Sequence, residues 1–234
     1  MSRTHSILHC LAYPLWTGPA EPVMRLARAQ LDAGHEVALA LDRLRDGDLV
    51  GKAAEWGVPL FDGLSLSVKA GPILNMRDIL AFKRLFADGR FEFIHCHRSH
   101  DHTLAALARP KRSRTRLLRT LHTEEAASPS RRWQLRRADG LICTFEAMRD
   151  DLRGRGLMAP DRIVAIEGAV DSGIFSAGRV GLGRRHSPGG HGGSHEGGTR
   201  APVAAQCMEA GGSQAARGSP FVGGSRRAGR ISQA

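Results

Sequence analysis

The stretch that most limits the possible folds is residues 138–175, which read ADGLICTFEAMRDDLRGRGLMAPDRIVAIEGAVDSGIF. An apolar run at 141–143 predicts a short buried strand. The next segment predicts a helix that the Thr144 hydroxyl caps and that ends near Gly154, with arginines in its last turn. A second apolar strand is predicted at 163–166. Two apolar strands joined by one helix are typical of a parallel sheet that helices cover on both faces.

The same alternation extends back to the start of the chain. We expect further strands at 6–12, 37–41, 58–61, 91–94 and 116–121. We expect helices at 20–33, 49–56, 76–87 and 103–108. The core contacts predicted for the helix at 76–87 are Ile79, Leu80, Leu85 and Phe86. The predicted fold class of residues 1–178 is therefore α/β, a Rossmann-like doubly wound parallel sheet.

The character of the sequence changes after residue 178. Residues 179–234 contain 14 of the 28 glycines, set among Ser, Arg, Ala and Pro, and the hydrophobic periodicity is lost. We expect this Gly/Arg-rich tail to be disordered, because such a composition buries too little apolar surface to offset its conformational entropy. The predicted domain organisation is a folded domain at 1–178 followed by a low-complexity tail at 179–234.

The net charge of +11 is unevenly distributed. The tail holds eight Arg and two acidic residues, so the predicted domain is only mildly basic. Its basic runs have little aromatic interleaving for base stacking, which makes nucleic acid an unlikely partner. The four cysteines include no CxxC pair, which indicates small buried side chains in a reducing compartment. With no signal-like start and no long apolar run, we expect a cytoplasmic protein.

Four histidines, His95, His97, His100 and His102, form an H-x-H-x-x-H-x-H array after the strand at 91–94. His95 and His97 are expected to share one strand face, as metal ligands can. The array resembles the HxHxDH pattern of metallo-β-lactamase-like hydrolases, but Ser99 stands where that pattern requires Asp. A metallohydrolase is therefore an alternative, and our expectation is a site without a metal, whose histidines line a cleft or cap a strand end.

A second local feature is the run RRWQLRR at 131–137. Trp133 is flanked by Arg131, Arg132, Arg136 and Arg137, which resembles an interfacial anchor for an anionic membrane. The alternatives are a solvated basic face with Trp133 packed on the sheet, or a basic, non-enzymatic binding module that also uses the tail.

Several motifs in order carry a resemblance to a known family. Near the start, Gly18-Pro-Ala20-Glu is followed by Leu-Ala-Arg and by Gly34-His-Glu-Val. Near the end, an apolar strand and helix lead to Asp-Arg-Ile and then to Gly168-Ala-Val-Asp171, close to Phe175. Together these resemble the N-terminal acceptor domain of family 4 glycosyltransferases, which is one half of a GT-B fold. Pro19 replaces a family glycine, and the hinge lacks the family's usual Asn.

The resemblance implies a function and a set of site residues. Family 4 enzymes transfer a sugar from a nucleotide-sugar to a glycan or lipid-linked acceptor with retention of configuration, generally without a metal or other cofactor. By position, Gly18 and Ala20 would face the donor phosphates at a helix N-terminus. His122, at the end of the strand at 116–121, would lie near the reacting sugar as the catalytic residue. His97 and Thr123 would line the acceptor cleft.

The tail bears on whether such a protein works alone. The donor domain of the family has no recognisable counterpart in residues 179–234. Arg, Gly, Ala, Pro and Ser have GC-rich codons, so we interpret the tail as a frameshift or truncation product of a GC-rich gene. We expect another reading frame after codon 178 to encode a donor domain, and the 234-residue chain to be inactive alone.

Overall fold

The computed structural model describes residues 3–124 and 128–168, and the tail at 179–234 lies outside the described residues. Six parallel strands form one sheet in the order β2-β1-β3-β4-β5-β6. Their bounds are β1 Ser6–Leu11, β2 Glu36–Leu41, β3 Phe93–Cys96, β4 Arg116–Leu121, β5 Gly140–Cys143 and β6 Ile163–Ala165. The predicted fold class is confirmed.

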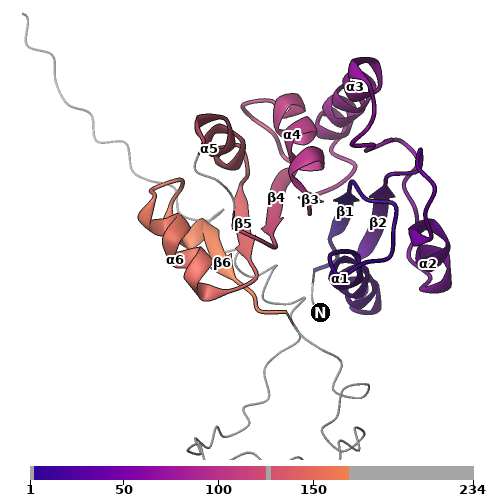
Figure 1. The fold of residues 1–234 in the computed structure, drawn as a ribbon, viewed down its shortest axis with the longest axis horizontal. Helices are drawn as coiled ribbons and strands as arrows, with labels where there is room; N and C mark the ends of the chain where they lie inside the picture. Colours follow the sequence, from indigo (N-terminus) through magenta and orange to yellow (C-terminus); the bar gives the residue numbers. More distant parts are fainter. Residues whose placement is uncertain (1–2, 125–127, 169–234) are drawn as a thin grey trace, which may run out of the picture.

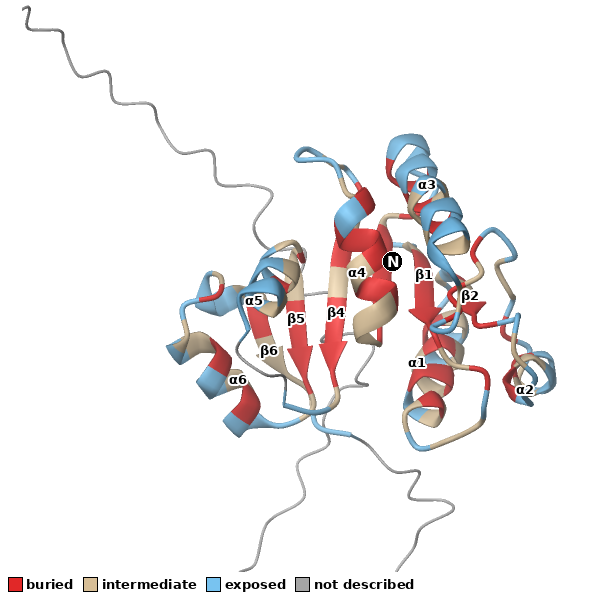
Figure 2. Cartoon of the chain, turned by 45° about the horizontal axis from the view of Figure 1, so that its top comes forward, coloured by how far each residue is buried: buried red, intermediate tan, exposed pale blue. Residues whose placement is uncertain are grey.

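Helices cover both faces of this sheet (Figure 1). Their bounds are α1 Ala20–Asp32, α2 Leu49–Glu55, α3 Pro72–Asp88, α4 Ser99–Ala108, α5 Pro129–Arg136 and α6 Glu146–Gly154, with a 3-10 turn at Pro160–Arg162. Helices α3, α4, α5 and α6 pack on one face, and α1 and α2 pack on the other. Strand residues are buried almost throughout, whereas each helix turns an exposed side outward (Figure 2). Two-sided coverage explains why the strands read as continuous apolar runs.

The core divides along the two sides of β1. Leu8 and Cys10 pack against α3 and α4, whereas Ile7 and Leu11 pack against α1 and α2. Successive strand residues point to opposite faces, so one apolar strand serves both layers. A third cluster, around Leu141, joins β5 and β6 to α6 and to Leu135 of α5. No helix of the described residues is long and apolar enough to cross a membrane.

Some predicted boundaries were wrong for local reasons. The segment at 58–61 contributes a single parallel bridge, Leu39 with Leu60, rather than a full strand. Helix α4 begins at Ser99 instead of residue 103, because the Asp101 carboxylate accepts the backbone N–H of Arg98 at 2.9 Å and caps the first turn. Residue Phe145, not Thr144, occupies the N-cap of α6.

The rotation of α3 also differs from the prediction. Leu80, expected in the core, is exposed, while Asp78 and Phe82 are buried beneath the helix. The helix begins at Pro72 rather than residue 76. Asp78 explains the rotation, because its carboxylate accepts the backbone N–H groups of Ser65 and Leu66 and so must face inward.

Candidate functional site

The strand order defines where a ligand belongs in this fold. With the bridge to Leu60, the chain runs from β1 through β2 to the sheet edge and then returns to β3 on the other side of β1. Open α/β sheets bind ligands outside the carboxyl ends of the strands at this reversal point. Here that place lies between the segments that follow β1 and β3, namely Tyr13 onward and His97 onward.

Three histidines meet at this point, and we call His9, His95 and His97 the histidine cluster. His9 lies opposite His95 in the β1–β3 pairing, and His97 follows β3 directly. The His9 Nδ1 and His97 Nε2 atoms are 2.9 Å apart, and His9 Nε2 is 2.6 Å from Gln30 Oε1 of α1. His95 Nε2 is 2.7 Å from the Thr120 hydroxyl of β4. The cluster is therefore tied to both neighbouring strands and to α1.

The hydrogen bonds set the proton positions in the cluster. Because the Gln30 carbonyl oxygen accepts, His9 Nε2 carries a proton and His9 Nδ1 accepts one from His97 Nε2. All three rings are buried, and burial lowers the pKa of His9 to about 4. Burial also holds the pKa of His95 and of His97 well below the usual range, and the neighbouring histidines lower both further. The cluster is thus neutral at pH 7.

The geometry of the cluster suits a hydrogen-bonded stack better than a shared ion. One ring nitrogen of each histidine lies within 4.8 Å of the others, so a metal is chemically conceivable. The His95 and His97 ring centres lie 4.1 Å apart, and the two ring planes are tilted by 35°. The hydrogen bond between His9 Nδ1 and His97 Nε2 already uses one nitrogen of each of these two rings, and His95 Nε2 is within hydrogen-bond distance of Thr120. Holding one ion would require ring rotation and loss of the His9–His97 hydrogen bond.

The linear histidine array does not assemble as a unit. Only His95 and His97 belong to the cluster, whereas His100 and His102 lie on α4. His102 is buried, and its pKa falls to about 3 through burial and the nearby cations, Arg119 first. The member that completes the cluster, His9, was missed by the sequence reasoning. In the sequence, His9 is a single histidine within an apolar strand. Its place in the cluster depends on the pairing of β1 with β3, which sets His9 opposite His95.

Two buried charged residues, Asp101 of α4 and Arg119 of β4, lie next to the backbone that carries His97. Asp101 accepts the backbone N–H of His97 at 3.2 Å and that of His102 at 2.8 Å. Burial raises its pKa to about 7, against the opposing charge of Arg119 and these hydrogen bonds. Arg119, on β4, is itself buried. This support fixes the backbone that carries His97.

His122 follows β4 at the same edge of the sheet. Its ring centre lies 6.2 Å from that of His97, and its pKa is lowered by burial and by Arg119 and Arg98. Its Nε2 atom is buried and has no hydrogen-bond partner within residues 3–124 and 128–168. Thr123, the next residue, is exposed. The structure therefore brings His97 and His122 close together at the carboxyl ends of β3 and β4. The sequence predicted each of them at a strand end but not that they would be neighbours.

The residues expected at the phosphates lie at the start of α1. Gly18 is exposed, and nothing lies within 4 Å of where a Cβ would stand. Ala20 is buried, and its backbone N–H donates to the Thr17 carbonyl at 2.8 Å. Pro19 and Pro22 have no N–H to offer. The helix start therefore offers an anion fewer free donors than a typical N-terminus, with the open space at Gly18 as its accessible part.

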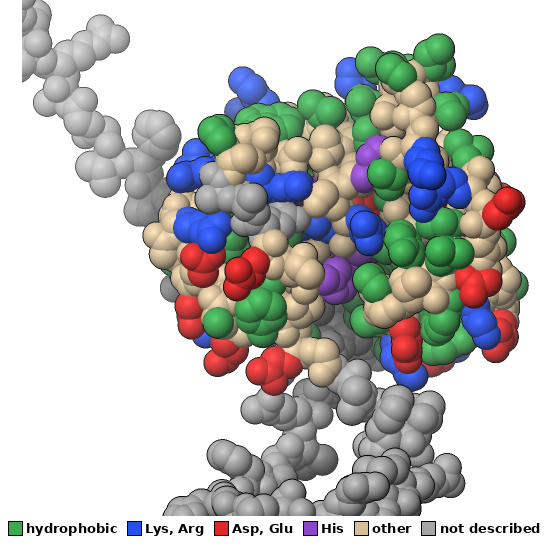
Figure 3. Space-filling view, in the orientation of Figure 1, with side chains coloured by type: hydrophobic (Ala, Val, Ile, Leu, Met, Phe, Trp, Pro, Cys, Tyr) green, Lys and Arg blue, Asp and Glu red, His purple; other side chains and the backbone are tan. Residues whose placement is uncertain are grey.

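The basic run at 131–137 lies on and just after α5. Trp133, Arg132 and Arg136 are exposed, whereas Arg131 is half-buried and donates to Gln134 at 2.8 Å. Arg137 donates to the Ala106 carbonyl at 3.1 Å. Arg137 therefore has a structural role in joining α5 to α4. Figure 3 shows basic and histidine side chains gathered near the middle of the face in view.

Comparison with known proteins identifies a family and several structures with a similar fold. Residues 17–173 match the family model described as Glycosyltransferase Family 4. A glycosyltransferase from Rickettsia africae ESF-5 superposes with a TM-score of 0.61 at 16% identity, over 76% of this chain and 47% of that one. Anabaena HepE in complex with UDP-glucose gives 0.51 at 14%, over 73% and 46%. UDP-GlcNAc 2-epimerase from Neisseria meningitidis, bound to UDP-GlcNAc, gives 0.52 at 12%, over 68% and 45%.

These structural likenesses are too distant in sequence to show more than the fold. The chain spans less than half the length of each of these three structures. A search among curated proteins finds no significant match. The family model, in contrast, covers more than half of the chain and includes β2 to β6 with their connecting helices. The chain therefore belongs to glycosyltransferase family 4, and its described residues form the N-terminal domain of that family.

Proposed function

We propose that this domain is the acceptor half of a retaining glycosyltransferase that moves a sugar from a nucleotide-sugar to a glycan or lipid-linked acceptor. The bond from the anomeric carbon to the phosphate oxygen breaks, and a bond to the acceptor oxygen forms. The acceptor proton leaves with the nucleoside diphosphate. The observation that carries the proposal is the family match over residues 17–173, together with His122 and His97 at the reversal point of the sheet.

Residue roles follow from position along this edge. His122, a partly exposed ring whose Nε2 has no hydrogen-bond partner among the described residues and whose pKa is lowered by burial, is the group that approaches the reacting sugar. A neutral imidazole can donate or accept a hydrogen bond without adding charge beside the donor. His97 and Thr123 border the acceptor, and Gly18 with the start of α1 at Ala20 borders the donor phosphates. No cofactor is required, because such chemistry depends on positioning and on stabilising the leaving diphosphate.

We also propose that the 234-residue chain does not turn over alone. The described residues form one Rossmann-like unit, and the solved structures that it resembles are about twice as long. The family pairs this unit with a nucleotide-binding unit. We place the protein in the cytoplasm, where nucleotide-sugars are made and where its free cysteines Cys10, Cys96 and Cys143 would stay reduced.

The test uses the chain both as it stands and joined to a family donor domain, with a panel of nucleotide-sugars and mass-spectrometric detection of product. We expect transfer only from the joined protein, with the product anomer, read by NMR, matching the donor. His122→Ala should lower kcat/KM by about 10²-fold or more with an unchanged melting temperature, because an interaction near the transition state is lost. His35→Ala, at the opposite edge of the sheet, is the control. Transfer by the 234-residue chain, or an inverted product, would contradict the proposal.

A further inference from the structure

Helix α3 exposes an apolar stripe that the fold does not use. Ile73 is 79% exposed, Met76 55% and Leu80 46%. Their spacing of three and four residues places them on one face of the helix, opposite the buried Phe82 and Phe86. Large apolar side chains gathered in one exposed stripe, rather than scattered singly, mark an interaction surface.

Three cations share this outward face. Arg77, Lys83 and Arg84 are all exposed and fall within the same side of the helix as the apolar stripe. Of the two acidic residues of α3, Asp78 is buried under the helix, and Asp88 is exposed one turn beyond Arg84, at the last position of the helix. The outward face of α3 is therefore apolar and predominantly basic, with three cations and one carboxylate, Asp88, at its C-terminal end.

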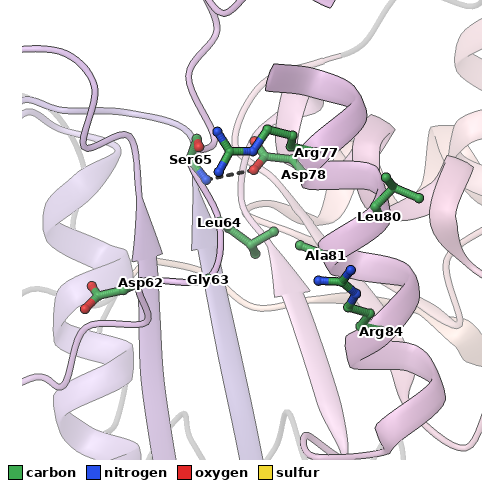
Figure 4. A pocket seen from close by; sticks show the side chains of 9 residues that line it. All are labelled: Asp62, Gly63, Leu64, Ser65, Arg77, Asp78, Leu80, Ala81 and Arg84. Carbon is green, nitrogen blue, oxygen red and sulfur yellow. Dashed lines mark hydrogen bonds between the residues drawn. The ribbon is translucent and has the colours of Figure 1, made fainter. Parts of the chain in front are cut away.

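Beside this face lies an open hollow of about 290 Å³ between α3 and the loop at 62–65. Arg77 and Arg84 extend their guanidinium groups from α3 toward the loop (Figure 4). The two carboxylates nearby are already engaged. Asp62 is paired with Arg43, and Asp78 accepts the backbone N–H groups of the loop. The hollow thus presents two cations, about two helical turns apart, to an incoming anion.

We propose that the outward face of α3 docks on an anionic lipid bilayer. Ile73, Met76 and Leu80 would enter the boundary between headgroups and acyl chains, and Arg77 and Arg84 would hold a lipid phosphate in the hollow. A helix that combines an apolar stripe with flanking cations is the form that binding in the plane of such a membrane takes. The charge decides against a second copy of this chain, because two faces that each carry three cations repel.

This surface is separate from α5, where a single exposed aromatic, Trp133, stands between arginines. It is also separate from the histidine cluster, so its test does not depend on sugar transfer. Both helices lie on the same side of the sheet (Figure 1). The experiment therefore has to distinguish α3 from α5, and from the Arg-rich residues 179–234, which all variants retain.

The full chain is mixed with phosphatidylcholine vesicles with and without phosphatidylglycerol, and binding is measured by co-sedimentation. We expect binding only with phosphatidylglycerol, weakening as salt rises. The double variant Ile73→Glu with Met76→Glu should bind at least about tenfold more weakly, because two carboxylates enter the face. Arg77→Gln with Arg84→Gln should weaken binding similarly, about tenfold for two cations. Both sites are exposed, so the fold should persist, as circular dichroism will show.

The matched control, Arg132→Gln with Arg136→Gln, removes two exposed charges from α5 and should change binding by less than about threefold. Glycerol 3-phosphate in excess should not release the protein, because the apolar stripe needs the bilayer and not the phosphate alone. The proposal is overturned if the wild type ignores phosphatidylglycerol, if the α5 variant loses as much binding as the α3 variants, or if soluble phosphate releases the protein. A wild-type dimer abolished by the Ile73 and Met76 substitutions would equally overturn it.

Discussion

At the scale of single residues, the site is a set of histidines kept neutral by burial. His9 and His97 share a hydrogen bond of 2.9 Å, and Gln30 settles which nitrogen of His9 carries the proton. Burial disfavours the imidazolium, and so the native state resists protonation that the unfolded chain accepts near pH 6.5. The same chemistry that shapes the site therefore makes the fold sensitive to acid.

The first prediction concerns this acid sensitivity. The pKa of His9 is lowered to about 4 and that of His102 to about 3, so the stability each contributes is complete above pH 6.5 and is lost as pH falls toward those values. His9 alone accounts for about 3 kcal/mol at low pH, at 1.36 kcal/mol per pKa unit. Asp101, whose pKa is raised to about 7, acts oppositely, because its contribution is lost as pH rises from about 4 to about 7.

Because several histidines oppose one carboxyl group, we expect the free energy of unfolding to fall between pH 6.5 and pH 4. His102→Leu, which removes one buried titrating ring, should flatten this profile without affecting the histidine cluster. Urea unfolding at a series of pH values measures both. A wild-type profile that is level across this interval would contradict the prediction.

The second prediction is that the histidine cluster works without a metal. His9 Nδ1 and His97 Nε2 already share a hydrogen bond, His9 Nε2 is within hydrogen-bond distance of Gln30, and His95 Nε2 is within that distance of Thr120. We expect no stoichiometric zinc or iron in the purified protein after dialysis, by mass spectrometry of the metal content. The metallohydrolase alternative would be restored by one equivalent of zinc that survives dialysis and is lost in His97→Ala. Weak surface binding would persist in that variant and so is distinguishable.

At the scale of elements, α3 shows how one buried acid orients a helix. Asp78 accepts two loop N–H groups, which holds the loop against α3 and turns Leu80 outward. Leu66 in that loop has φ of 48°, a left-handed conformation that costs a leucine roughly 1–2 kcal/mol. The burial of the Leu66 side chain and the hydrogen bond that its backbone N–H donates to Asp78 offset this cost. The exposed face of α3 is thus a consequence of the loop.

The third prediction tests this link. Asp78→Ala leaves two backbone N–H groups without their acceptor in a buried place, so we expect a loss of about 2–4 kcal/mol in the free energy of unfolding. Asp78→Asn keeps one acceptor oxygen and should lose about half as much. Chemical denaturation of both variants measures the difference. Equal losses in the two variants would show that charge or volume, rather than the accepted hydrogen bonds, is responsible.

At the scale of the whole molecule, one sheet with two helical layers accounts for every described element. The six strands, the reversal point and the family match form a single unit that ends near β6. The proposed boundary at residue 178 lies outside the described residues. It rests on the loss of hydrophobic periodicity in the sequence beyond that point.

The fourth prediction concerns this boundary. Limited proteolysis of the full chain should leave a resistant fragment that ends near residue 178, because a segment without a packed core offers extended backbone to a protease. Mass spectrometry of the fragment gives its end to the residue. A resistant fragment that extends well past Arg200 would show that the Gly/Arg-rich segment contains folded structure.

The sequence alone determined most of the strands and helices, but it did not predict helix α5, and it predicted a strand at 58–61 where there is a single bridge. Apolar runs such as Ile163–Ala165, and helix ends such as Gly89 with its φ of 62°, depend on neighbours within a few residues. It also placed His97 and His122 at strand ends. Only the tertiary structure decided that His9 would meet His97, 88 positions along the chain, and that Leu80 would face outward. Both depend on which strand or loop packs beside each element. Hydrophobic periodicity predicts which face of an element is buried, but not which distant segment will pack against it.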